Sequence, residues 1–242
     1  MRQLAHFADV RSPSSVYVPE SRFGLWFLGT GIWETHVLAR AIDDLSRLIG
    51  GRVIAAPVIV DVGCGWGHSF KLLQDRFAPH RMVGIDIDPA MLEAAGERTA
   101  KLGLSVEFRL GASASLPLAG ETADLIFCHQ TFHHFVDQEG ALREFRRVLK
   151  PGGLLLFAES TKAYIHSWII RLLFRHPMEV QRTAPEYLAM IRASGFAVAP
   201  GAISHPYLWW SRPDLGVLER WFGVTPRAGH EETLLNLVAV RQ

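Results

Sequence analysis

The sequence predicts an α/β fold built on a doubly wound, mostly parallel sheet. Three observations carry this prediction. Short apolar runs alternate with helical patterns between residues 56 and 160, the first run leads straight into a glycine-rich turn, and the second run ends in an acid. A chain of 242 residues that is 49% hydrophobic can bury one large core, so we expect a single domain.

Each expected strand is a short run rich in Val, Ile, Leu or Phe, with polar or turn residues at its ends. Seven runs have this pattern: Val58–Val62, Arg81–Asp86, Ser105–Leu110, Ala123–Cys128, Gly153–Glu159, Phe196–Ala199 and Thr233–Val240. Helical patterns lie before, between and after them, at Glu34–Ile49, His68–Phe77, Pro89–Leu102, Gln138–Leu149 and Pro185–Ser194. Pro89 suits a first helical turn and Gly103 suits a helix stop.

Charge and termini narrow the class of function. The 25 basic residues nearly cancel the 24 acidic ones, leaving a net charge of +1. No global field attracts phosphate backbones, so we expect no nucleic acid partner. Met1–Val10 lacks the basic and then apolar pattern of a secretory signal, and the apolar segment Tyr164–Phe174 is interrupted by polar residues. We therefore expect a cytoplasmic protein.

The two cysteines, Cys64 and Cys128, have no paired spacing of the kind that metal ligands show. We expect both thiols to be reduced and buried, with neither a disulfide nor a zinc site.

The most informative motif is the run from Val58 to His68, VIVDVGCGWGH, in which an apolar strand leads into glycine at every second position. Gly63, Gly65 and Gly67 allow positive φ angles and a close approach of the backbone to a ligand. The helix that follows favours a carboxylate or phosphate at its N-terminus. A nicotinamide fingerprint, G-x-G-x-x-G, would need glycine where His68 stands, so the spacing argues against a nicotinamide dinucleotide.

The second expected strand ends in Asp86, 19 residues after Gly67. In doubly wound sheets an acid at this point accepts hydrogen bonds from the hydroxyls of a ribose. Asp88, next to Pro89, is expected to cap the following helix. Ile87 either packs on an adenine ring or is a structural residue at the strand end.

With these residues the chain resembles the class I S-adenosylmethionine-dependent methyltransferases, especially the small-molecule branch that includes the ubiquinone and menaquinone biosynthesis enzymes. The resemblance covers roughly Ile59–Glu159. It rests on motifs in the family's order, at Asp61–Gly67, Gly84–Leu92, Leu116–Leu118, Ala123–Ile126, His133–Phe135 and Arg147–Gly153. It implies a Rossmann-like sheet of seven strands, mostly parallel with an antiparallel last strand, plus helical lid elements.

The resemblance also implies the cofactor, S-adenosylmethionine, and the residues that contact it. These are Asp61, Gly63, Cys64, Gly65, Gly67, Asp86, Ile87, Ala112, Ser113 and His129. The glycines would line the methionine part, Asp86 would hold the ribose and Ile87 would border the adenine. The sequence departs from the family at Gly111, where relatives often continue with an aspartate that contacts the adenine amino group. Ser113 or backbone groups would take over that contact here.

We expect the single domain, 1–242, to have four segments. They are an N-terminal helical cap (1–55), a cofactor-binding core (56–160), a helical insertion (161–182) and a C-terminal part that completes the sheet and adds an aromatic-rich lid (183–242). The lid prediction rests on the long link Ser204–Glu232, which contains Tyr207, Trp209, Trp210, Trp221 and Phe222.

Methyl transfer from a sulfonium is an in-line displacement, so the protein mainly aligns donor and acceptor and excludes water. A hydroxyl or acidic carbon acceptor additionally needs a base, and histidine is the usual one. His129, His133 and His134 follow the fourth strand, at the edge where ligands bind in this architecture. Two interpretations stay open: one of the three abstracts a proton, or all three contact the cofactor and cap local structure.

The chain has seven tryptophans, which concentrate in the N-terminal segment, the insertion and the final link. We expect these rings to cover a small, apolar or aromatic acceptor. The alternative is that they close a secondary core or a dimer contact. His129–Thr131 stands where many nucleobase methyltransferases have an Asn/Asp-Pro-Pro-aromatic tetrapeptide, which argues against DNA adenine. We find no acidic metal-binding set of the catechol type and expect no metal.

The insertion has an amphipathic pattern with basic residues on its polar side, Lys162, Arg171 and Arg175. Besides a substrate lid or ordinary packing, peripheral contact of 162–176 with an anionic membrane is therefore an alternative. Two other functions remain as rivals: a noncatalytic S-adenosylmethionine-binding domain and a nicotinamide-dependent oxidoreductase. The sequence does not predict an oligomeric state.

Overall fold

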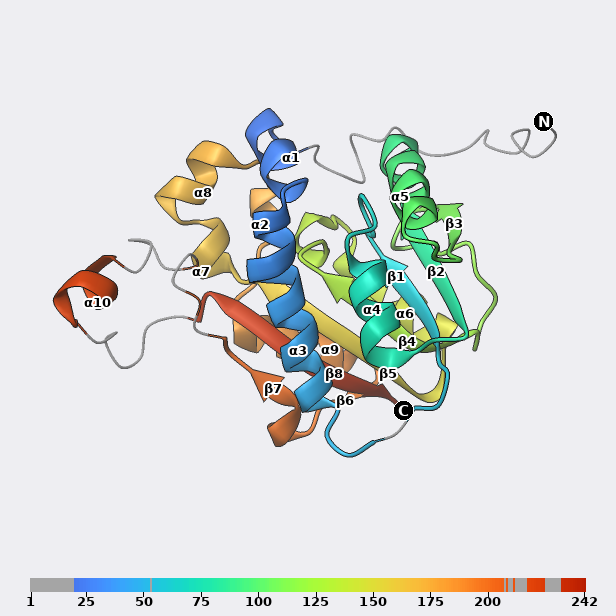
Figure 1. Ribbon diagram of the computed structural model, residues 1–242. Helices are drawn as coiled ribbons and strands as arrows, with labels where there is room; N and C mark the ends of the chain where they lie inside the picture. Colours follow the sequence, from blue (N-terminus) through green and yellow to red (C-terminus); the bar gives the residue numbers. More distant parts are fainter. Residues whose placement is uncertain (1–19, 53, 207, 209–210, 212–216, 225–231) are drawn as a thin grey trace.

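The computed structural model describes residues 20–52, 54–206, 208, 211, 217–224 and 232–242 (Figure 1). Over these residues the strands form one eight-stranded sheet in the order β3-β2-β1-β4-β5-β8-β6, with β7 paired to β8. The strands β1 to β5 pair in parallel, whereas β8 runs antiparallel to both β5 and β6. The predicted α/β class, with a mostly parallel, doubly wound sheet and an antiparallel last strand, is confirmed.

The strands match the expected ranges with small differences. Their bounds are β1 (Val58–Val62), β2 (Arg81–Asp86), β3 (Glu107–Leu110), β4 (Ala123–His129), β5 (Leu149–Ser160), β6 (Phe196–Ala197), β7 (Ile203–Ser204) and β8 (Leu234–Arg241). β5 begins earlier than expected because Leu149 already pairs with Ala123, before a register shift. β7 was not predicted, since two residues are too few to show a period.

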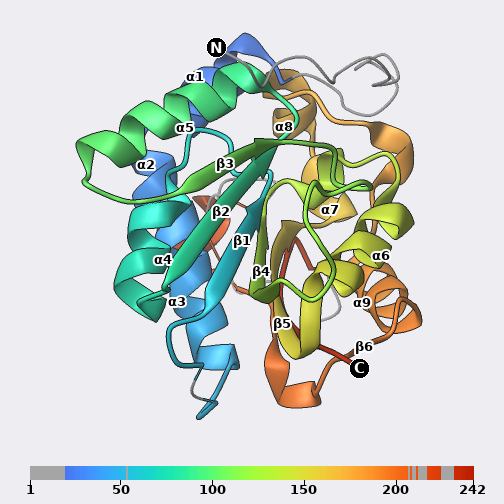
Figure 2. The ribbon, with the colours of Figure 1, turned by 90° about the vertical axis from the view of Figure 1, so that its right-hand side faces the viewer.

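Helices cover both faces of the sheet: α3, α4 and α5 lie on one side, α6 and α9 on the other (Figure 2). The bounds of the helices and helical turns are α1 (Arg22–Leu28), α2 (Gly31–Trp33), η2 (Glu34–Leu38), α3 (Ala39–Leu48), α4 (Ser69–Phe77), α5 (Pro89–Lys101), η3 (Phe132–His134), α6 (Gln138–Val148), α7 (Lys162–Ile165), α8 (Trp168–Leu173), η4 (Met178–Val180), α9 (Ala184–Ala193), η5 (Pro200–Ala202) and α10 (Val217–Phe222). None of the helices in the described part of the chain is both long enough and apolar enough to cross a membrane.

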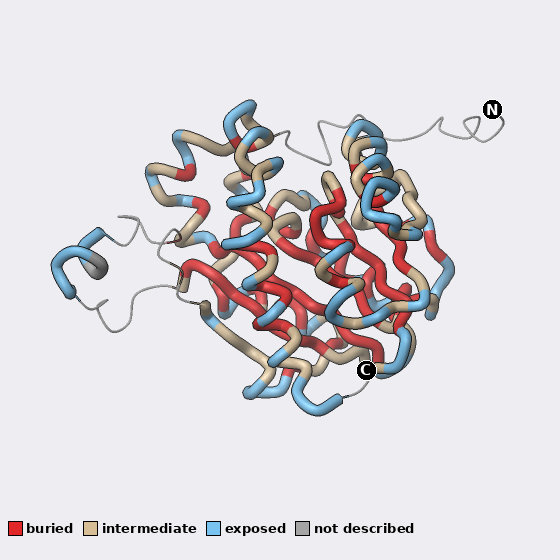
Figure 3. Tube along the Cα trace, in the orientation of Figure 1, coloured by how far each residue is buried: buried red, intermediate tan, exposed pale blue. Residues whose placement is uncertain are grey.

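The central strands are buried on both faces, which is why they appear in the sequence as continuous apolar runs (Figure 3). Alternate residues serve opposite cores. Val60 and Val62 belong to the cluster that contains α6 and α9 residues, whereas Ile59 belongs to the cluster that contains α3 and α4 residues. All three side chains are at most 2% exposed. This two-sided burial fixes where each strand ends and therefore where its polar end residues lie.

The start of α5 follows the sequence prediction. Asp88 caps the helix by accepting the Ala90 N–H at 2.9 Å, and Pro89 stands in its first turn. With Asp88 used in this way, Asp86 is the strand-end acid that remains for a ligand.

The expected helix over the insertion is wrong in one respect: it is two short helices, α7 and α8, separated at His166 and Ser167. The start of α7 is tied down by backbone hydrogen bonds, from Thr161 N–H to the Thr233 carbonyl and from Lys162 N–H to the Arg182 carbonyl. Because α7 is anchored beside β8, the chain must turn before α8 can reach the N-terminal helices.

The N-terminal segment and the insertion lie together at one end of the molecule, where α1, α2 and α8 are neighbours (Figure 1). Ser21 Oγ donates a hydrogen bond to the Leu173 carbonyl at 2.5 Å, and the Arg175 N–H donates to Glu20 Oε1 at 2.7 Å. The helix expected from Glu34 begins with the π-helical turn η2, preceded by α1 and α2, which were not predicted. Two segments that are distant in sequence thus form one cap.

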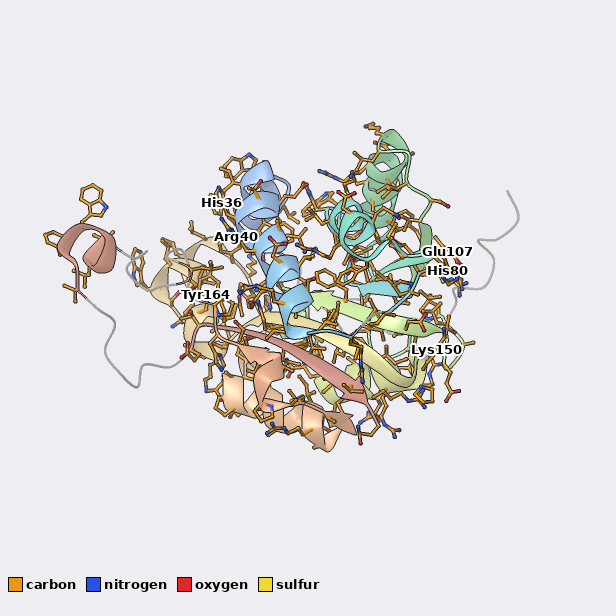
Figure 4. The ribbon with its side chains drawn as sticks, turned by 60° about the horizontal axis from the view of Figure 1, so that its bottom comes forward. His36, Arg40, His80, Glu107, Lys150 and Tyr164 are labelled. Atoms are coloured by element: carbon orange, nitrogen blue, oxygen red, sulfur yellow. The ribbon has the colours of Figure 1, made fainter. Side chains whose placement is uncertain are left out.

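The two edges of the sheet differ in chemistry. At the amino ends of the strands, Lys150 Nζ pairs with Asp124 Oδ1 at 2.8 Å and Arg81 pairs with Glu107 at 2.6 Å. Tyr164, which follows the carboxyl end of β5, lies far across the molecule from Glu107 and Lys150 (Figure 4). At the amino edge of the sheet these charged side chains are therefore neutralised by one another. We look for a polar binding site at the carboxyl edge instead.

Two glycines provide a test of the packing. A Cβ at Gly84, inside β2, would lie 2.8 Å from Phe70 Cζ and 2.9 Å from Phe108 Cδ1, whereas a Cβ at Gly96, on α5, meets nothing within 4 Å. We expect Gly84→Ala to lower the free energy of unfolding by about 1–3 kcal/mol because it overpacks the core. Gly96→Ala should raise it by about 0.5–1 kcal/mol because alanine is the better helix former. Urea unfolding of both variants measures these changes, and equal effects would contradict the packing described.

Candidate active site

A cavity of about 150 Å³ opens at the carboxyl ends of β1, β2 and β4. Its floor is formed by these strand ends and the turns after them, and its roof by Leu25, Leu28 and Trp33 of the N-terminal helices. In open α/β sheets ligands bind outside the carboxyl ends of the strands, where the strand order reverses. That point lies here between β1 and β4, which are neighbours in the sheet but not in the sequence.

The glycine-rich turn after β1 adopts the backbone that its sequence predicts. Gly63, Gly65 and Gly67 have φ angles of 76°, 50° and 72°, a region that favours glycine. A Cβ at Gly63 would lie 2.2 Å from Thr131 Oγ1, so this glycine lets the loop after β4 approach. A Cβ at Gly65 would meet no atom within 4 Å, because that side of the residue faces the cavity.

Asp86 lies in the cavity wall at the end of β2. One carboxylate oxygen accepts the Gly65 N–H at 2.9 Å and the other accepts the Asp88 N–H at 3.0 Å. These bonds fix the orientation of the carboxylate and leave each oxygen a further lone pair. Burial raises the pKa of Asp86, and the two backbone donors counteract that shift. Such a fixed carboxylate can accept hydrogen bonds from two adjacent hydroxyls.

Asp61 and Cys64 also line the cavity. Asp61 accepts a hydrogen bond from Ser69 Oγ. Burial, and to a smaller extent the charge of Asp86, raise the pKa of Asp61 to about 7, although the Ser69 hydroxyl lowers it. Burial likewise raises the pKa of the Cys64 thiol, as expected for a reduced, unreactive cysteine. Because the pKa of Asp61 is close to neutral pH, a cation bound beside Asp61 would stabilise its ionised form.

The remaining residues expected to contact a cofactor are placed differently. Ile87, Ser113 and His129 line the cavity, whereas Gly67 and Ala112 do not. Gly67 serves packing instead, because a Cβ there would lie 3.0 Å from Ala95 Cβ of α5. Ala112 forms an isolated β-bridge with Ser115, and Ser113, which lies between them in the sequence, lines the cavity.

A buried carboxylate organises the loop after β4. Glu159, near the end of β5, is 0% exposed. Its Oε1 accepts the N–H groups of Thr131 and Phe132 at 2.8 and 2.7 Å, and its Oε2 lies 2.6 Å from His133 Nδ1. With two backbone donors on the same group, Glu159 is the acceptor throughout and His133 Nδ1 carries the hydrogen. Nε2 of His133 is then on the side of the ring that faces away from Glu159.

The other two histidines, His129 at the end of β4 and His134 on η3, pack against aromatic rings or other histidines. His129 stacks on Phe127 at 5.8 Å and meets Trp33 edge-on at 5.3 Å. Burial, together with the charge of His133, lowers the pKa of His129 to about 3. Burial also holds the pKa of His134 well below its usual value. His129 is therefore neutral at physiological pH, and burial favours the neutral form of His134 as well.

A second cavity, of about 70 Å³, adjoins the first. The two share the wall residues Glu20, Leu28, Trp33, Gln130 and His134. Most of the other residues that line the second cavity are apolar or aromatic: Phe27, Val37, Tyr164, Ile165, Ile170 and Phe174. The remaining ones are Ser160, His133 and His176. The aromatic-rich N-terminal segment and the insertion thus meet over one small apolar space.

The predicted lid from the final link does not reach these cavities in the described part of the chain. Tyr207, Trp209 and Trp210 lie outside the described residues. Trp221 and Phe222 are on α10, are 77% and 71% exposed, and line neither cavity.

Comparison with known proteins bears on the first cavity. Residues 60–157, which contain the glycine turn, Asp86 and the histidine loop, match a family model described as a methyltransferase domain. The chain carries a class I S-adenosylmethionine-dependent methyltransferase domain. S-adenosylmethionine is the cofactor of this domain.

Curated relatives of the methyltransferase domain differ in what they act on. A malonyl-[acyl-carrier protein] O-methyltransferase of Coxiella burnetii is 38% identical over 134 residues, which cover 51% of this chain and 44% of the relative. A phosphoethanolamine N-methyltransferase of Arabidopsis thaliana is 31% identical over 140 residues, which cover 58% of this chain and 27% of the relative. The chain thus spans less than half the length of these two relatives.

Solved structures support the fold over most of the chain. A chain of the complex between the Haloferax volcanii Trm112 methyltransferase activator and a methyltransferase aligns with a TM-score of 0.65 at 21% identity, covering 90% of this chain and 95% of that one. A methyltransferase from Aquifex aeolicus aligns with a TM-score of 0.63 at 19% identity, covering 90% and 97%. The shared fold therefore extends beyond residues 60–157 to most of the chain.

Sequence reasoning missed Glu159, His176, Glu20 and Met91, all of which lie at the two cavities or support them. Glu159 had a usable signal, because it is an acid near the end of the strand next to β4 and both strands end at the same edge. His176 and Glu20 had none, since their neighbours in space come from distant parts of the sequence.

Asp86, at the end of β2, and Asp88, just after it, give a matched test of cofactor binding by the methyltransferase domain. Asp86→Asn places an amide NH₂ where an oxygen accepts a backbone N–H, and it removes the charge that would attract ribose hydroxyls. Hydrogen bonds to charged groups contribute about 1.5–3 kcal/mol, so affinity for S-adenosylmethionine should fall about 10- to 100-fold. Asp88→Asn keeps the helix cap and should leave affinity unchanged. Calorimetry measures the affinity of both variants for S-adenosylmethionine. If Asp86→Asn and Asp88→Asn bind it equally well, Asp86 does not hold the ribose.

Proposed function

We propose that the protein transfers the methyl group of S-adenosylmethionine to a small, largely apolar or aromatic acceptor held in the second cavity. The observation that carries this proposal is the placement of that cavity. It is lined mainly by apolar side chains and shares a wall with the cavity at the glycine turn. An acceptor and the cofactor would therefore lie side by side, as an in-line displacement requires.

For the cofactor we propose contacts from Asp61, Gly63, Cys64, Gly65, Asp86, Ile87, Ser113 and His129, all of which line the first cavity. Asp86 would hold the ribose and the open face of Gly65 would admit the amino acid part. The cofactor supplies an activated methyl on a sulfonium. The protein's own contribution is to orient that group and to keep water away, since the charge fades during transfer.

The apolar wall supports an acceptor of matching chemistry. Phe27 and Phe174 meet edge-to-face at 6.0 Å, and Ile165 and Ile170 are at most 5% exposed. Small-molecule sites are commonly apolar with a few placed polar groups. Here the polar groups of the second cavity are the histidines, Tyr164, Glu20, Gln130 and Ser160.

An acceptor hydroxyl or thiol must lose its proton. Of the three histidines expected at this edge, His129 and His134 have pKa values lowered by burial and suit poorly as bases near neutral pH. His133 is held by Glu159 and faces the second cavity. We propose that His133 is the histidine that takes the acceptor proton.

Two rival functions are less well supported. A nicotinamide-dependent oxidoreductase disagrees with the glycine spacing and with the family match over 60–157. A noncatalytic cofactor-binding domain would have no need of the second cavity. The acceptors in the relatives' names, an acyl carrier protein ester and phosphoethanolamine, differ from each other, so neither is carried over to this chain.

The outer face of the insertion supports an additional proposal, that α8 rests on an anionic membrane from which an apolar acceptor enters. Trp168 and Leu172 are 67% and 73% exposed, and Arg171 and Arg175 are exposed beside them. Aromatic and aliphatic side chains flanked by arginines suit the interface of an anionic bilayer.

One experiment tests both parts of this proposal. The protein is incubated with methyl-labelled S-adenosylmethionine and, separately, with the soluble and the membrane fraction of a cell extract, and labelled products are identified by mass. We expect label in a small apolar or aromatic molecule. Ile170→Ala, which opens the second cavity, should lower kcat/KM about 10-fold without changing cofactor affinity. Trp168→Ala should lower labelling only from the membrane fraction.

Two outcomes would contradict these expectations. Label found only in proteins would refute the small-molecule acceptor. Equal labelling by Trp168→Ala and the unmodified protein in the membrane fraction would refute the membrane contact and leave the acceptor cavity standing.

A further inference from the structure

We propose that His133, His134 and His176 bind a divalent transition metal ion, with zinc as the reference ion, at the wall of the second cavity. This inference deepens the proposed function, because the ion would activate the acceptor held there. It departs from the expectation of no metal, which rested on the cysteine spacing and on the lack of an acidic metal-binding set.

The first support is geometric. His133 and His134 are on η3 and His176 follows α8, yet their ring centroids are 4.4, 5.0 and 4.8 Å apart. One possible ligand nitrogen from each ring lies within 4.8 Å of the other two. An ion about 2.1 Å from each of three imidazole nitrogens needs them about 3.4 Å apart. Binding would therefore draw the three nitrogens together from separations of up to 4.8 Å.

The second support is the group behind His133. Metal-binding histidines almost always donate their other ring N–H to a carboxylate, a carbonyl or a water. His133 Nδ1 donates to Glu159 at 2.6 Å, and Glu159 is itself fixed by two backbone N–H groups. This arrangement holds the ring orientation and leaves Nε2 of His133 as the ligand atom on the side of the second cavity.

The third support is the position of the cluster. All three histidines line the second cavity, and His134 also lines the cavity proposed for the cofactor. Three protein ligands leave a fourth position for a water or a substrate atom, as in catalytic zinc sites. That position would face the acceptor, next to the point where the two cavities meet.

The chemistry of the ligands selects the kind of ion. Three imidazoles without a thiolate suit Zn²⁺, Co²⁺, Ni²⁺ or Fe²⁺, whereas Mg²⁺ and Ca²⁺ prefer oxygen ligands. Bound at this wall, the ion would coordinate an acceptor hydroxyl or thiol and lower its pKa. With the ion bound, His133 would serve as a ligand and no longer as the base, so the acceptor proton would pass to water. The acceptor oxygen or sulfur would then attack the methyl carbon, and the bond from that carbon to the cofactor sulfur would break.

The test uses the full chain without an affinity tag, treated with a chelator and then titrated with Zn²⁺ by calorimetry. We expect one ion per chain. His176→Ala should weaken zinc binding at least 100-fold, since it removes a ligand. His166→Ala is the matched control, because His166 is on the same insertion, is exposed and lines neither cavity. Glu159→Gln should weaken binding about 10- to 100-fold, the range for a group that orients a ligand.

Cobalt gives a second readout that does not depend on methyl transfer. Co²⁺ should produce the visible absorption of a tetrahedral, nitrogen-ligated site in the unmodified protein and in His166→Ala, and none in His176→Ala. Affinity for S-adenosylmethionine, measured on each variant, reports that the fold is intact.

Absence of bound zinc in the unmodified protein, or equal zinc affinity in His176→Ala and His166→Ala, would overturn the metal site. A labelled small-molecule product formed by metal-free protein would show that the proposed function stands without it. Zinc bound as expected, with no acceptor methylated in any extract, would instead refute the proposed function and leave the metal site in place.

Discussion

The site depends on one constraint: carboxylates that lie at the ends of buried parallel strands must be compensated. Taking a charge out of water is costly unless hydrogen bonds replace the solvent. Asp86 is compensated by the N–H groups of Gly65 and Asp88, and Glu159 by those of Thr131 and Phe132. The acids therefore fix the loops around them, and each loop carries residues that line the cavities.

Parallel pairing brings these loops to one edge. Because β1, β2, β4 and β5 run in the same direction, the glycine turn, Asp86, the histidine loop and Glu159 all lie at their carboxyl ends. The N-terminal helices and the insertion then cover that edge with apolar side chains. The result is two adjoining cavities, one with fixed polar groups and one that is mostly apolar, which is an arrangement suited to transferring a group between two bound molecules.

The core could be predicted from the sequence because its determinants are local. Buried strands, the cap at Asp88 and the positive φ of Gly63, Gly65 and Gly67 each follow from neighbouring residues. What could not be predicted depends on contacts across the chain. The break between α7 and α8 follows from hydrogen bonds to Thr233 and Arg182, and the approach of His176 to His133 follows from where α8 ends.

The central claim is that the cationic cofactor is held beside a buried strand-end carboxyl group, and proton release tests it most directly. The pKa of Asp61 is raised to about 7, so this group is partly protonated at pH 7. A cation bound beside Asp61 lowers that pKa, so a proton leaves on binding and affinity rises with pH until Asp61 is fully ionised.

Calorimetry of S-adenosylmethionine binding at pH 7, in buffers with different ionisation enthalpies, measures the number of protons exchanged. We expect the unmodified protein to release about half a proton more than Asp61→Asn does, and the difference to shrink at pH 8.5. Equal proton exchange by the two proteins at pH 7 would contradict it.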